Sequence, residues 1–144
     1  MYDLDFKQSG IIPFLISDGQ LKYLLITSNR TGKWIFPKGM IEENMTPSES
    51  AANEGLEEAG VIGTVYDNII YSYEYSWEGI VCKVDMFPFK IQQIKKDWEE
   101  PWRKRQLYTY DEALKSINEE LIEVLKKGHE YIIREFKEEL KNRE

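Results

Sequence analysis

The stretch "WIFPKGMIEENMTPSESAANEGLEEAGV", Trp34–Val61, crowds three carboxylates into five residues. They are Glu54, Glu57 and Glu58, and no lysine or arginine lies between Gly39 and Val61. Neighbouring like charges repel, so a chain that places them together without a nearby cation requires a physical explanation.

The residues before Gly60 are typical of a helix. Thr46 can cap its first turn, Pro47 suits the first helical position, and Glu49 completes a capping box. Gly60 can end it, because glycine readily adopts the left-handed conformation of a helix C-cap. The pattern predicts a helix that carries all three carboxylates.

Residues three and four apart share one face of a helix, so the three glutamates are expected to point the same way, toward solvent or a metal. The opposite face should pack on a sheet, and it carries Ala52, Leu56 and Ala59. A solvated acidic face explains such a cluster. A divalent cation also explains it, because hard oxygen ligands suit Mg²⁺ or Mn²⁺.

The remaining pattern predicts an α+β domain with a mixed sheet covered by helices. Strands are expected at residues 10–16, 22–27, 33–36 and 105–110, with a loop at 38–46 and two long strands within 61–90 that break near 76–79. A helical region is expected to begin at Asp111. A long C-terminal helix is expected at about 119–142, and Gly128 can bend or split it. We expect residues 1–144 to form a single domain.

Composition narrows the class of protein. The chain has 144 residues and a formal net charge of −7, which argues against general nucleic-acid binding. No apolar run approaches the roughly 18 residues that span a bilayer, so we expect no membrane association. The one cysteine, Cys82, excludes an internal disulfide, and the prediction is a cytoplasmic protein.

The helix and the loop before it resemble the signature of the Nudix hydrolases, G-x5-E-x7-R-E-U-x-E-E-x-G-U, with U a bulky aliphatic residue. Laid on this chain, the signature covers 39–61 without a gap. The matching positions are Gly39, Glu54, Glu57, Glu58, Gly60 and Val61. Met45 stands where the family has Glu, Asn53 where it has Arg, and Gly55 where it has an aliphatic residue.

The resemblance extends over most of residues 8–115. The segments "QSGIIPFLI", "LLITSNRTGKWIFPKG" and "DWEEPWRKRQLYTYDEAL" are similar to the branch that includes dinucleoside polyphosphate and diphosphoinositol polyphosphate hydrolases. The resemblance implies the Nudix fold, a mixed sheet sandwiched between helices. The long C-terminal helix carries no recognisable motif.

The resemblance also implies a chemistry, in which water attacks phosphorus while Mg²⁺ or Mn²⁺ neutralises the developing charge. Glu54 and Glu58 are then the expected metal ligands, and Glu57 is a third ligand or the group that activates water. The carbonyl of Gly39 is a plausible further ligand.

The substrate expected from the family is a small diphosphate of the nucleoside diphosphate-X type, with a dinucleoside polyphosphate favoured. Lys38 and Arg30 are candidate phosphate-binding residues, against the alternative of solvated surface cations. Arg103 and Arg105 belong to a basic segment that can face phosphate or form a solvated loop. A homodimer is left open.

The departures leave two classes open, a metal-dependent hydrolase and a Nudix-fold nucleotide-binding or regulatory module with little turnover. Asn53 can donate a hydrogen bond to a carboxylate of the signature, but it carries no charge. Met45 removes one carboxylate of the signature, and Glu42 or Glu43 can replace it.

The sequence also allows predictions for three tyrosines and for the single histidine. Tyr71, Tyr73 and Tyr75 alternate along one strand face, where packing is the default and stacking on a nucleobase the alternative. His129, the one histidine, is expected on the surface or in packing.

Overall fold

Eight strands form one mixed sheet in the computed structural model, which describes residues 6–141 except the side chain of Trp77. The strands are β1 (Phe6–Ser17), β2 (Gln20–Thr27), β3 (Trp34–Ile35), β4 (Lys38–Met40), β5 (Val61–Val65), β6 (Tyr71–Trp77), β7 (Ile80–Ile94) and β8 (Arg105–Tyr108). The order is β3-β2-β1-β7-β5, with β4 paired to β1, β6 to β7 and β8 to β2. Strands β1 and β7 run parallel and β1 and β2 antiparallel, so the predicted mixed sheet is confirmed.

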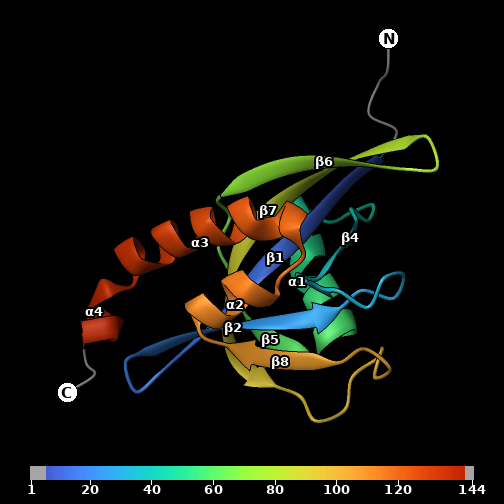
Figure 1. Cartoon of the computed structure of the whole chain (residues 1–144). Helices are drawn as coiled ribbons and strands as arrows, with labels where there is room; N and C mark the ends of the chain where they lie inside the picture. Colours follow the sequence, from blue (N-terminus) through green and yellow to red (C-terminus); the bar gives the residue numbers. More distant parts are fainter. Residues whose placement is uncertain (1–5, 142–144) are drawn as a thin grey trace.

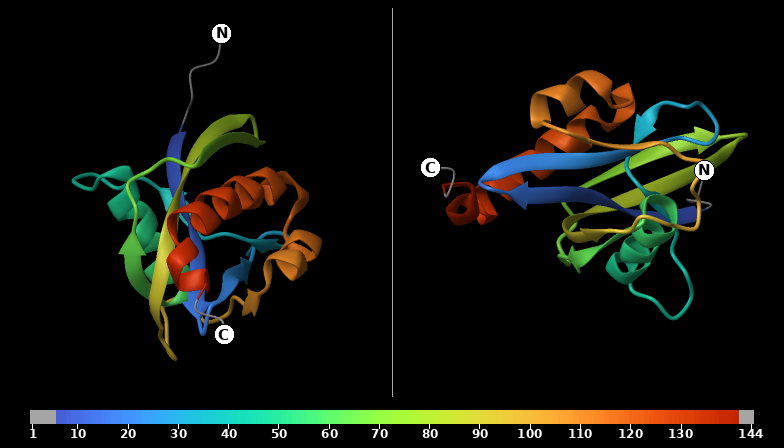
Figure 2. Two further views of the ribbon diagram at one scale, coloured as in Figure 1. Left: turned by 90° about the vertical axis from the view of Figure 1, so that its left-hand side faces the viewer. Right: turned by 90° about the horizontal axis from the view of Figure 1, so that it is seen from below.

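Helices cover both faces of this sheet. Helix α1 (Pro47–Ala59) lies on one face, and α2 (Tyr110–Ser116), the 3₁₀ turn η1 (Glu119–Leu121) and α3 (Ile122–Glu135) lie on the other, followed by α4 (Lys137–Lys141). The left view of Figure 2 shows the strands between these two helical layers, and Figure 1 shows α3 crossing the sheet. The predicted α/β/α arrangement is confirmed.

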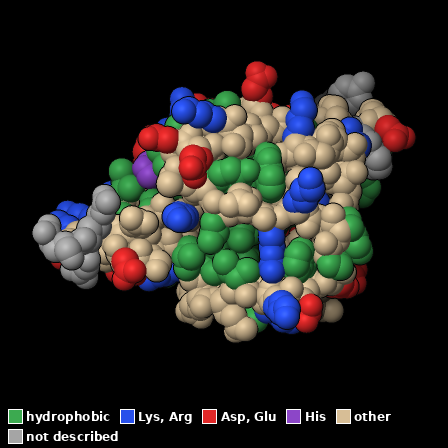
Figure 3. All heavy atoms as spheres, turned by 60° about the horizontal axis from the view of Figure 1, so that its bottom comes forward, with side chains coloured by type: hydrophobic (Ala, Val, Ile, Leu, Met, Phe, Trp, Pro, Cys, Tyr) green, Lys and Arg blue, Asp and Glu red, His purple; other side chains and the backbone are tan. Residues whose placement is uncertain are grey.

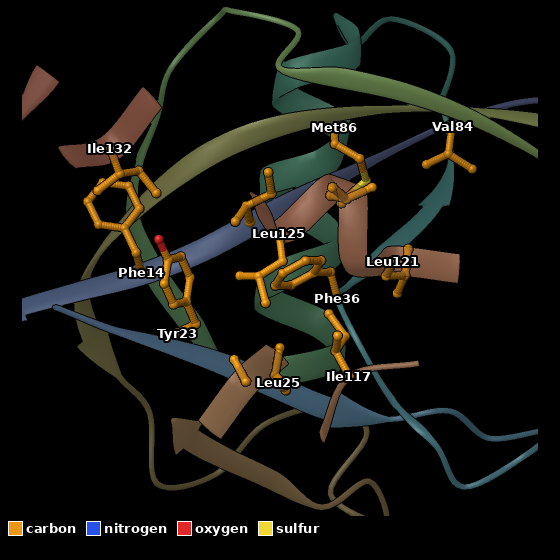
Figure 4. Packing of buried hydrophobic residues seen from close by; sticks show 13 residues of the cluster. Phe14, Tyr23, Leu25, Phe36, Val84, Met86, Ile117, Leu121, Leu125 and Ile132 are labelled. Carbon is orange, nitrogen blue, oxygen red and sulfur yellow. The ribbon is translucent and has the colours of Figure 1, made fainter. Parts of the chain in front are cut away.

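The sequence of β1 explains why both faces are covered. Successive strand residues point to opposite faces, so Ile11 packs toward α1 while Ile12 and Phe14 pack toward α3. All three are fully buried, which is why this strand reads as a continuous apolar run. Figure 4 shows the cluster on the α3 side, where side chains from β1, β2, β7 and the C-terminal helices converge.

Helix α1 begins and ends as its sequence predicts. The Thr46 hydroxyl accepts a hydrogen bond from the Glu49 N–H at 3.1 Å, and the Glu49 carboxylate accepts one from the Thr46 N–H at 2.9 Å. Gly60 ends the helix with a φ of 69°, a left-handed conformation that suits glycine.

The buried face of α1 is rotated from the one predicted. Leu56 is 37% exposed, so the prediction that it packs on the sheet is wrong. Ala59 is buried as predicted, and Ala51 and Gly55 are buried with it. A Cβ added at Gly55 would lie 2.5 Å from Ile11 Cδ1, so the helix sits too close to β1 for a larger residue there.

Three expectations about element bounds need correction. The loop predicted from Lys38 begins with β4, because Lys38 and Gly39 pair with β1. The region 61–90 holds parts of three strands, since β5 and β6 pair with different stretches of the long β7. The C-terminal helix is interrupted at Phe136 and is continuous through Gly128, whose missing side chain leaves room for Ile12.

The close contact between α1 and β1 generates a stability prediction. Gly55→Ala should lower the free energy of unfolding by about 1 kcal/mol or more, because overpacking outweighs the gain of about 1 kcal/mol in helix propensity. Ile11→Val removes the crowding Cδ1 atom, so the double variant should lose clearly less than the sum of the two single losses. Urea unfolding of the four proteins measures this, and strictly additive losses would show that the contact is not limiting.

Candidate active site

Two of the three glutamates of the Nudix signature lie together beside β4. Glu54 and Glu58 lie one turn apart on α1, and their carboxyl groups are close enough for each to affect the ionisation of the other. The Glu54 carboxyl group lies so close to Gly39 that a Cβ there would overlap it. Oε1 of Glu58 accepts a hydrogen bond from the backbone N–H of Lys38 at 3.2 Å. The loop before α1 therefore folds back onto the helix and holds both acids.

Glu58 is buried and has a cationic partner from far along the chain. It is 7% exposed, so its side chain does not face open solvent, which is one of the two surroundings predicted for it, the other being a metal ion. Nη2 of Arg103 lies 3.7 Å from Glu58 Oε2, and the same guanidinium bonds to Glu100 at 2.8 Å and to the Thr27 carbonyl at 2.9 Å. The positive charge missing from the local sequence is thus supplied by tertiary structure.

The environment favours the protonated forms of the acid pair. Burial raises the pKa of Glu54, and repulsion from the neighbouring Glu58 carboxylate adds to the effect. Burial also raises the pKa of Glu58, although Arg103 opposes the shift. Two adjacent carboxyl groups in a partly dry site behave this way until a cation replaces the shared proton.

Glu57 does not converge with this pair. Its Oε2 accepts a hydrogen bond from Asn53 Nδ2 at 2.8 Å, and the same amide donates to Glu42 Oε2 at 3.0 Å. The prediction that Asn53 offers a hydrogen bond without charge is confirmed, and the prediction that all three glutamates point the same way is wrong for Glu57. Within residues 6–141, no three His, Cys, Asp or Glu side chains are placed to hold a metal ion together.

Glu54 and Glu58 nevertheless fit a divalent cation in several respects. Their carboxylate oxygens are the donors that Mg²⁺ and Mn²⁺ prefer, and they lie together against a glycine that leaves space for close approach. Ser9 pairs with Gly39 across the β1–β4 ladder, and its fully buried hydroxyl has no hydrogen-bond partner among the described residues. The third carboxylate would have to turn from Asn53 to join them.

A cavity of about 260 Å³ opens beside Glu58. It is lined by Ser28, Asn29, Arg30, Thr31, Ile35, Lys38, Glu58, Tyr73, Tyr75, Arg103, Asn118, Glu120 and Leu121. The predicted phosphate-binding residues Lys38, Arg30 and Arg103 thus meet in one place, next to one of the candidate metal ligands. Three cations around one cavity suit an anionic ligand.

Lys38 is held in this cavity by tyrosine. Its Nζ donates to the Tyr75 hydroxyl at 3.2 Å and lies 4.8 Å from the ring centroid. The Tyr75 hydroxyl in turn donates to Gln8 Oε1 at 2.9 Å. Burial lowers the pKa of Lys38, an effect that Glu58 opposes. Tyr73 and Tyr75, predicted mainly as packing residues, also form part of the cavity wall.

Arg105 lies apart from the cavity, in contrast to the other predicted cations. Its guanidinium donates to the carbonyls of Ala59 at 2.8 Å and Lys95 at 2.6 Å, and it stacks 3.7 Å from the Trp98 ring centroid. These contacts fix the end of α1 to the segment before β8. The geometry gives Arg105 a structural role in place of substrate contact.

Sequence reasoning missed the contribution of the C-terminal segment. Asn118, Glu120 and Leu121 close one side of the cavity, although no motif marked them. His129, expected in packing, stacks on Tyr110 at 3.6 Å and bonds through Nδ1 to the buried Tyr23 hydroxyl at 2.8 Å. These contacts dock α3 on the sheet and so position the cavity wall. Only the apolar periodicity of α3 could have indicated this docking.

Comparison with known proteins gives the family. Residues 8–128 match the family model of the NUDIX domain. Nudix hydrolase 16, mitochondrial, of Arabidopsis thaliana is 32% identical over 127 residues, covering 75% of this chain and 70% of that protein. The chain therefore belongs to the Nudix hydrolase family. The predicted membership is confirmed, and with it the prediction of an enzyme.

A further relative and a solved structure are also similar to this chain. Diphosphoinositol polyphosphate phosphohydrolase 2 of Rattus norvegicus is 28% identical over 138 residues, covering 88% of this chain and 75% of that protein. The crystal structure of C. elegans Ap4A hydrolase has a TM-score of 0.74 at 18% identity, covering 88% of this chain and 98% of that one. At this identity the structural likeness shows the fold alone.

The comparisons leave the cytoplasmic location a prediction, because the Arabidopsis thaliana relative is named mitochondrial. In residues 6–141, no helix combines the length and apolar character needed to cross a membrane.

The acid pair generates a prediction about pH. The pKa of Glu54 is raised from 4.5 to about 8, so the folded metal-free protein binds protons more tightly than the unfolded chain. Its free energy of unfolding should then fall as pH rises between these values. Glu54→Gln should make the protein more stable than wild type at pH 8 by about 1–2 kcal/mol, discounted for solvent access, and nearly equal to it at pH 4.5. Urea unfolding in EDTA measures the difference.

Glu43→Gln, in the exposed loop before α1, is the matched control for this experiment and should follow wild type at both pH values. If the free energy of unfolding of Glu54→Gln does not exceed that of wild type at pH 8, the proposed repulsion within the acid pair is refuted.

The position of Asn53 generates a second prediction. Its amide already bridges Glu42 and Glu57, so Asn53→Arg places a cation between two carboxylates. We expect kcat/KM to rise, or the concentration of Mg²⁺ needed for half-maximal turnover to fall. Unchanged or lower kcat/KM on the best diphosphate substrate would mean that the neutral bridge belongs to a different arrangement of Glu57.

Proposed function

We propose that the chain is a metal-dependent hydrolase that cleaves a diphosphate linkage in a small substrate of the nucleoside diphosphate-X type. The observation that carries the proposal is the pair Glu54 and Glu58, of which Glu58 lines a cavity together with Arg30 and Lys38. Paired carboxylates suit a divalent cation, and the neighbouring cations suit phosphate.

The residues have distinct roles in this proposal. Glu54 and Glu58 would hold Mg²⁺ or Mn²⁺, with the Gly39 carbonyl as a further ligand. Such an ion, when bound, neutralises negative charge on phosphate oxygens and lowers the pKa of coordinated water. Glu57 accepts a proton from the attacking water or joins the ligands after it leaves Asn53.

Lys38 and Arg30 orient the diphosphate in the cavity. Lys38 reaches it from the start of β4 and Arg30 from the turn between β2 and β3, and positioning of this kind lowers the entropic cost of reaction. Arg103 acts differently, because its contacts with Glu58, Glu100 and Thr27 use most of its donors. We assign it the positioning of Glu58.

Substrate class rests on relatives and charge. A dinucleoside polyphosphate is favoured, since C. elegans Ap4A hydrolase shares the fold and a chain of net charge −7 suits a less anionic ligand than a diphosphoinositol polyphosphate. On the face in Figure 3, most Lys and Arg side chains are separated from one another by hydrophobic side chains, by other uncharged side chains or by backbone. That distribution favours a small ligand. The compartment that we propose is the cytoplasm, where the lone buried Cys82 would stay reduced.

A binding or regulatory module with little turnover is the second candidate. The diversion of Glu57 to Asn53 favours it, since catalysis by the proposed route needs that carboxylate. A phosphate-release assay on a panel of diphosphates with Mg²⁺ and Mn²⁺ separates the two functions. Nucleotides that raise the melting temperature without being cleaved would support the module.

Glu58→Gln tests the catalytic assignment. The amide can still accept the Lys38 N–H bond and Arg103 keeps Glu100, so the far-UV CD spectrum should be retained and the metal-free melting temperature should not fall. Turnover should fall by about two orders of magnitude, because a ligand of the proposed ion is lost. Adding Glu54→Gln should lower it little further, since the two carboxylates act as one unit.

Glu43→Gln is again the control, as an exposed glutamate outside the cavity. Wild-type protein should also gain melting temperature in millimolar Mn²⁺, a gain that Glu58→Gln should largely lose. Near-normal hydrolysis by Glu58→Gln would remove this helix from the catalytic role.

A further inference from the structure

One wall of the cavity carries a negative charge that the proposed diphosphate chemistry does not require. The wall comes from η1 and the residue before it, and it contributes Asn118, Glu120 and Leu121. We infer that Glu120 is a specificity-determining residue, which admits substrates whose polyphosphate chain ends in an uncharged nucleoside or sugar and disfavours those in which that terminal group is itself phosphorylated. This inference rests on the proposed function.

The supply of free cations in the cavity is small. Arg103 is committed to Glu58, Glu100 and the Thr27 carbonyl. The Lys38 ammonium uses one of its three donors on the Tyr75 hydroxyl. Within residues 6–141, the Arg30 side chain forms no hydrogen bond or ion pair, and it lies close enough to Tyr75 to influence its ionisation. Two available cations and a metal ion can balance the negative charge of the phosphates at the scissile linkage. They leave little positive charge for further phosphates.

Glu120 lies where the group beyond those phosphates would sit. It is exposed and lines the same cavity as Lys38 and Tyr73, where its negative charge opposes the lowering of the Lys38 pKa and adds to the raising of the Tyr73 pKa. The Asn118 amide donates to Glu120 Oε1 at 3.3 Å, which orients the carboxylate. A carboxylate in this place can accept hydrogen bonds from hydroxyl or amine groups, and it repels phosphate.

The surface beyond Glu120 carries a second hollow. A second, open hollow shares Arg30, Thr31, Asn118 and Glu120 with the cavity and adds Lys33 and Glu119. Glu120 therefore stands at the junction of the two hollows. A ligand that extends from the cavity into the second hollow lies near this carboxylate.

The aromatic wall favours an uncharged ring on the inner side of that junction. Tyr73 and Tyr75 lie with ring centroids 6.4 Å apart and a tilt of 32°, and both line the cavity. Burial raises the pKa of Tyr75 to about 12, so its hydroxyl stays neutral at physiological pH. Neutral rings and hydroxyls contact a nucleoside or sugar well and contribute no charge to balance extra phosphates.

The experiment compares kcat/KM for diadenosine tetraphosphate and diphosphoinositol pentakisphosphate, both with Mg²⁺, in the full-length chain. Wild type should prefer diadenosine tetraphosphate. Glu120→Lys should shift the ratio toward the inositol substrate by about tenfold or more, because charge reversal acts on several phosphates at once. Glu120→Gln should shift it in the same direction by less.

Glu119→Lys is the matched control, since it makes the same charge change on the adjacent residue outside the cavity. Dissociation constants for α,β-methylene-ADP and inositol hexakisphosphate, measured by calorimetry, provide a second readout that needs no turnover. Loss of all hydrolysis with a shifted binding ratio would reject the proposed function and keep the role of Glu120. The inference is overturned if Glu119→Lys shifts either ratio as much as Glu120→Lys does, or if wild type prefers the inositol compounds.

Discussion

The close approach of α1 to the sheet is the constraint on which the site depends. Small residues on the buried face of the helix, above all Gly55 over Ile11, let the helix axis come near β1. The same approach presses the Glu54 carboxyl group against Gly39 and brings Glu58 under the backbone of Lys38. Burial of two adjacent carboxylates then follows from packing, and so do their raised pKa values.

Charge in this region is balanced by segments that are distant in sequence. Arg103 reaches Glu58 from the loop between β7 and β8, and it is itself held by Thr27 at the end of β2. A buried charge without a partner is strongly destabilising, so this contact allows Glu58 to remain in the interior. The arginine that the family signature places at position 53 is replaced by a neutral amide that tethers Glu57 and Glu42.

The outer limit of the cavity depends on how the C-terminal helices dock. Gly128 allows α3 to pack on Ile12, and the bond between His129 and the buried Tyr23 anchors the same helix to β2. This docking sets the position of η1, and with it Glu120. The residues that shape the far side of the cavity are therefore placed by a packing interface with no chemical role of its own.

The sequence by itself determined the class of fold and the acidic helix. Capping residues, the period of the apolar pattern and the spacing of the glutamates act locally, so they can be read without knowing what packs where. Tertiary structure alone decided that Leu56 faces outward, that Glu57 diverges from Glu54 and Glu58, that Arg105 has a structural role, and that Glu120 lines the cavity. Each of these depends on the rotation of a helix or on contacts between distant segments. Such features are set by the shape complementarity of whole surfaces, which no local pattern in the chain encodes.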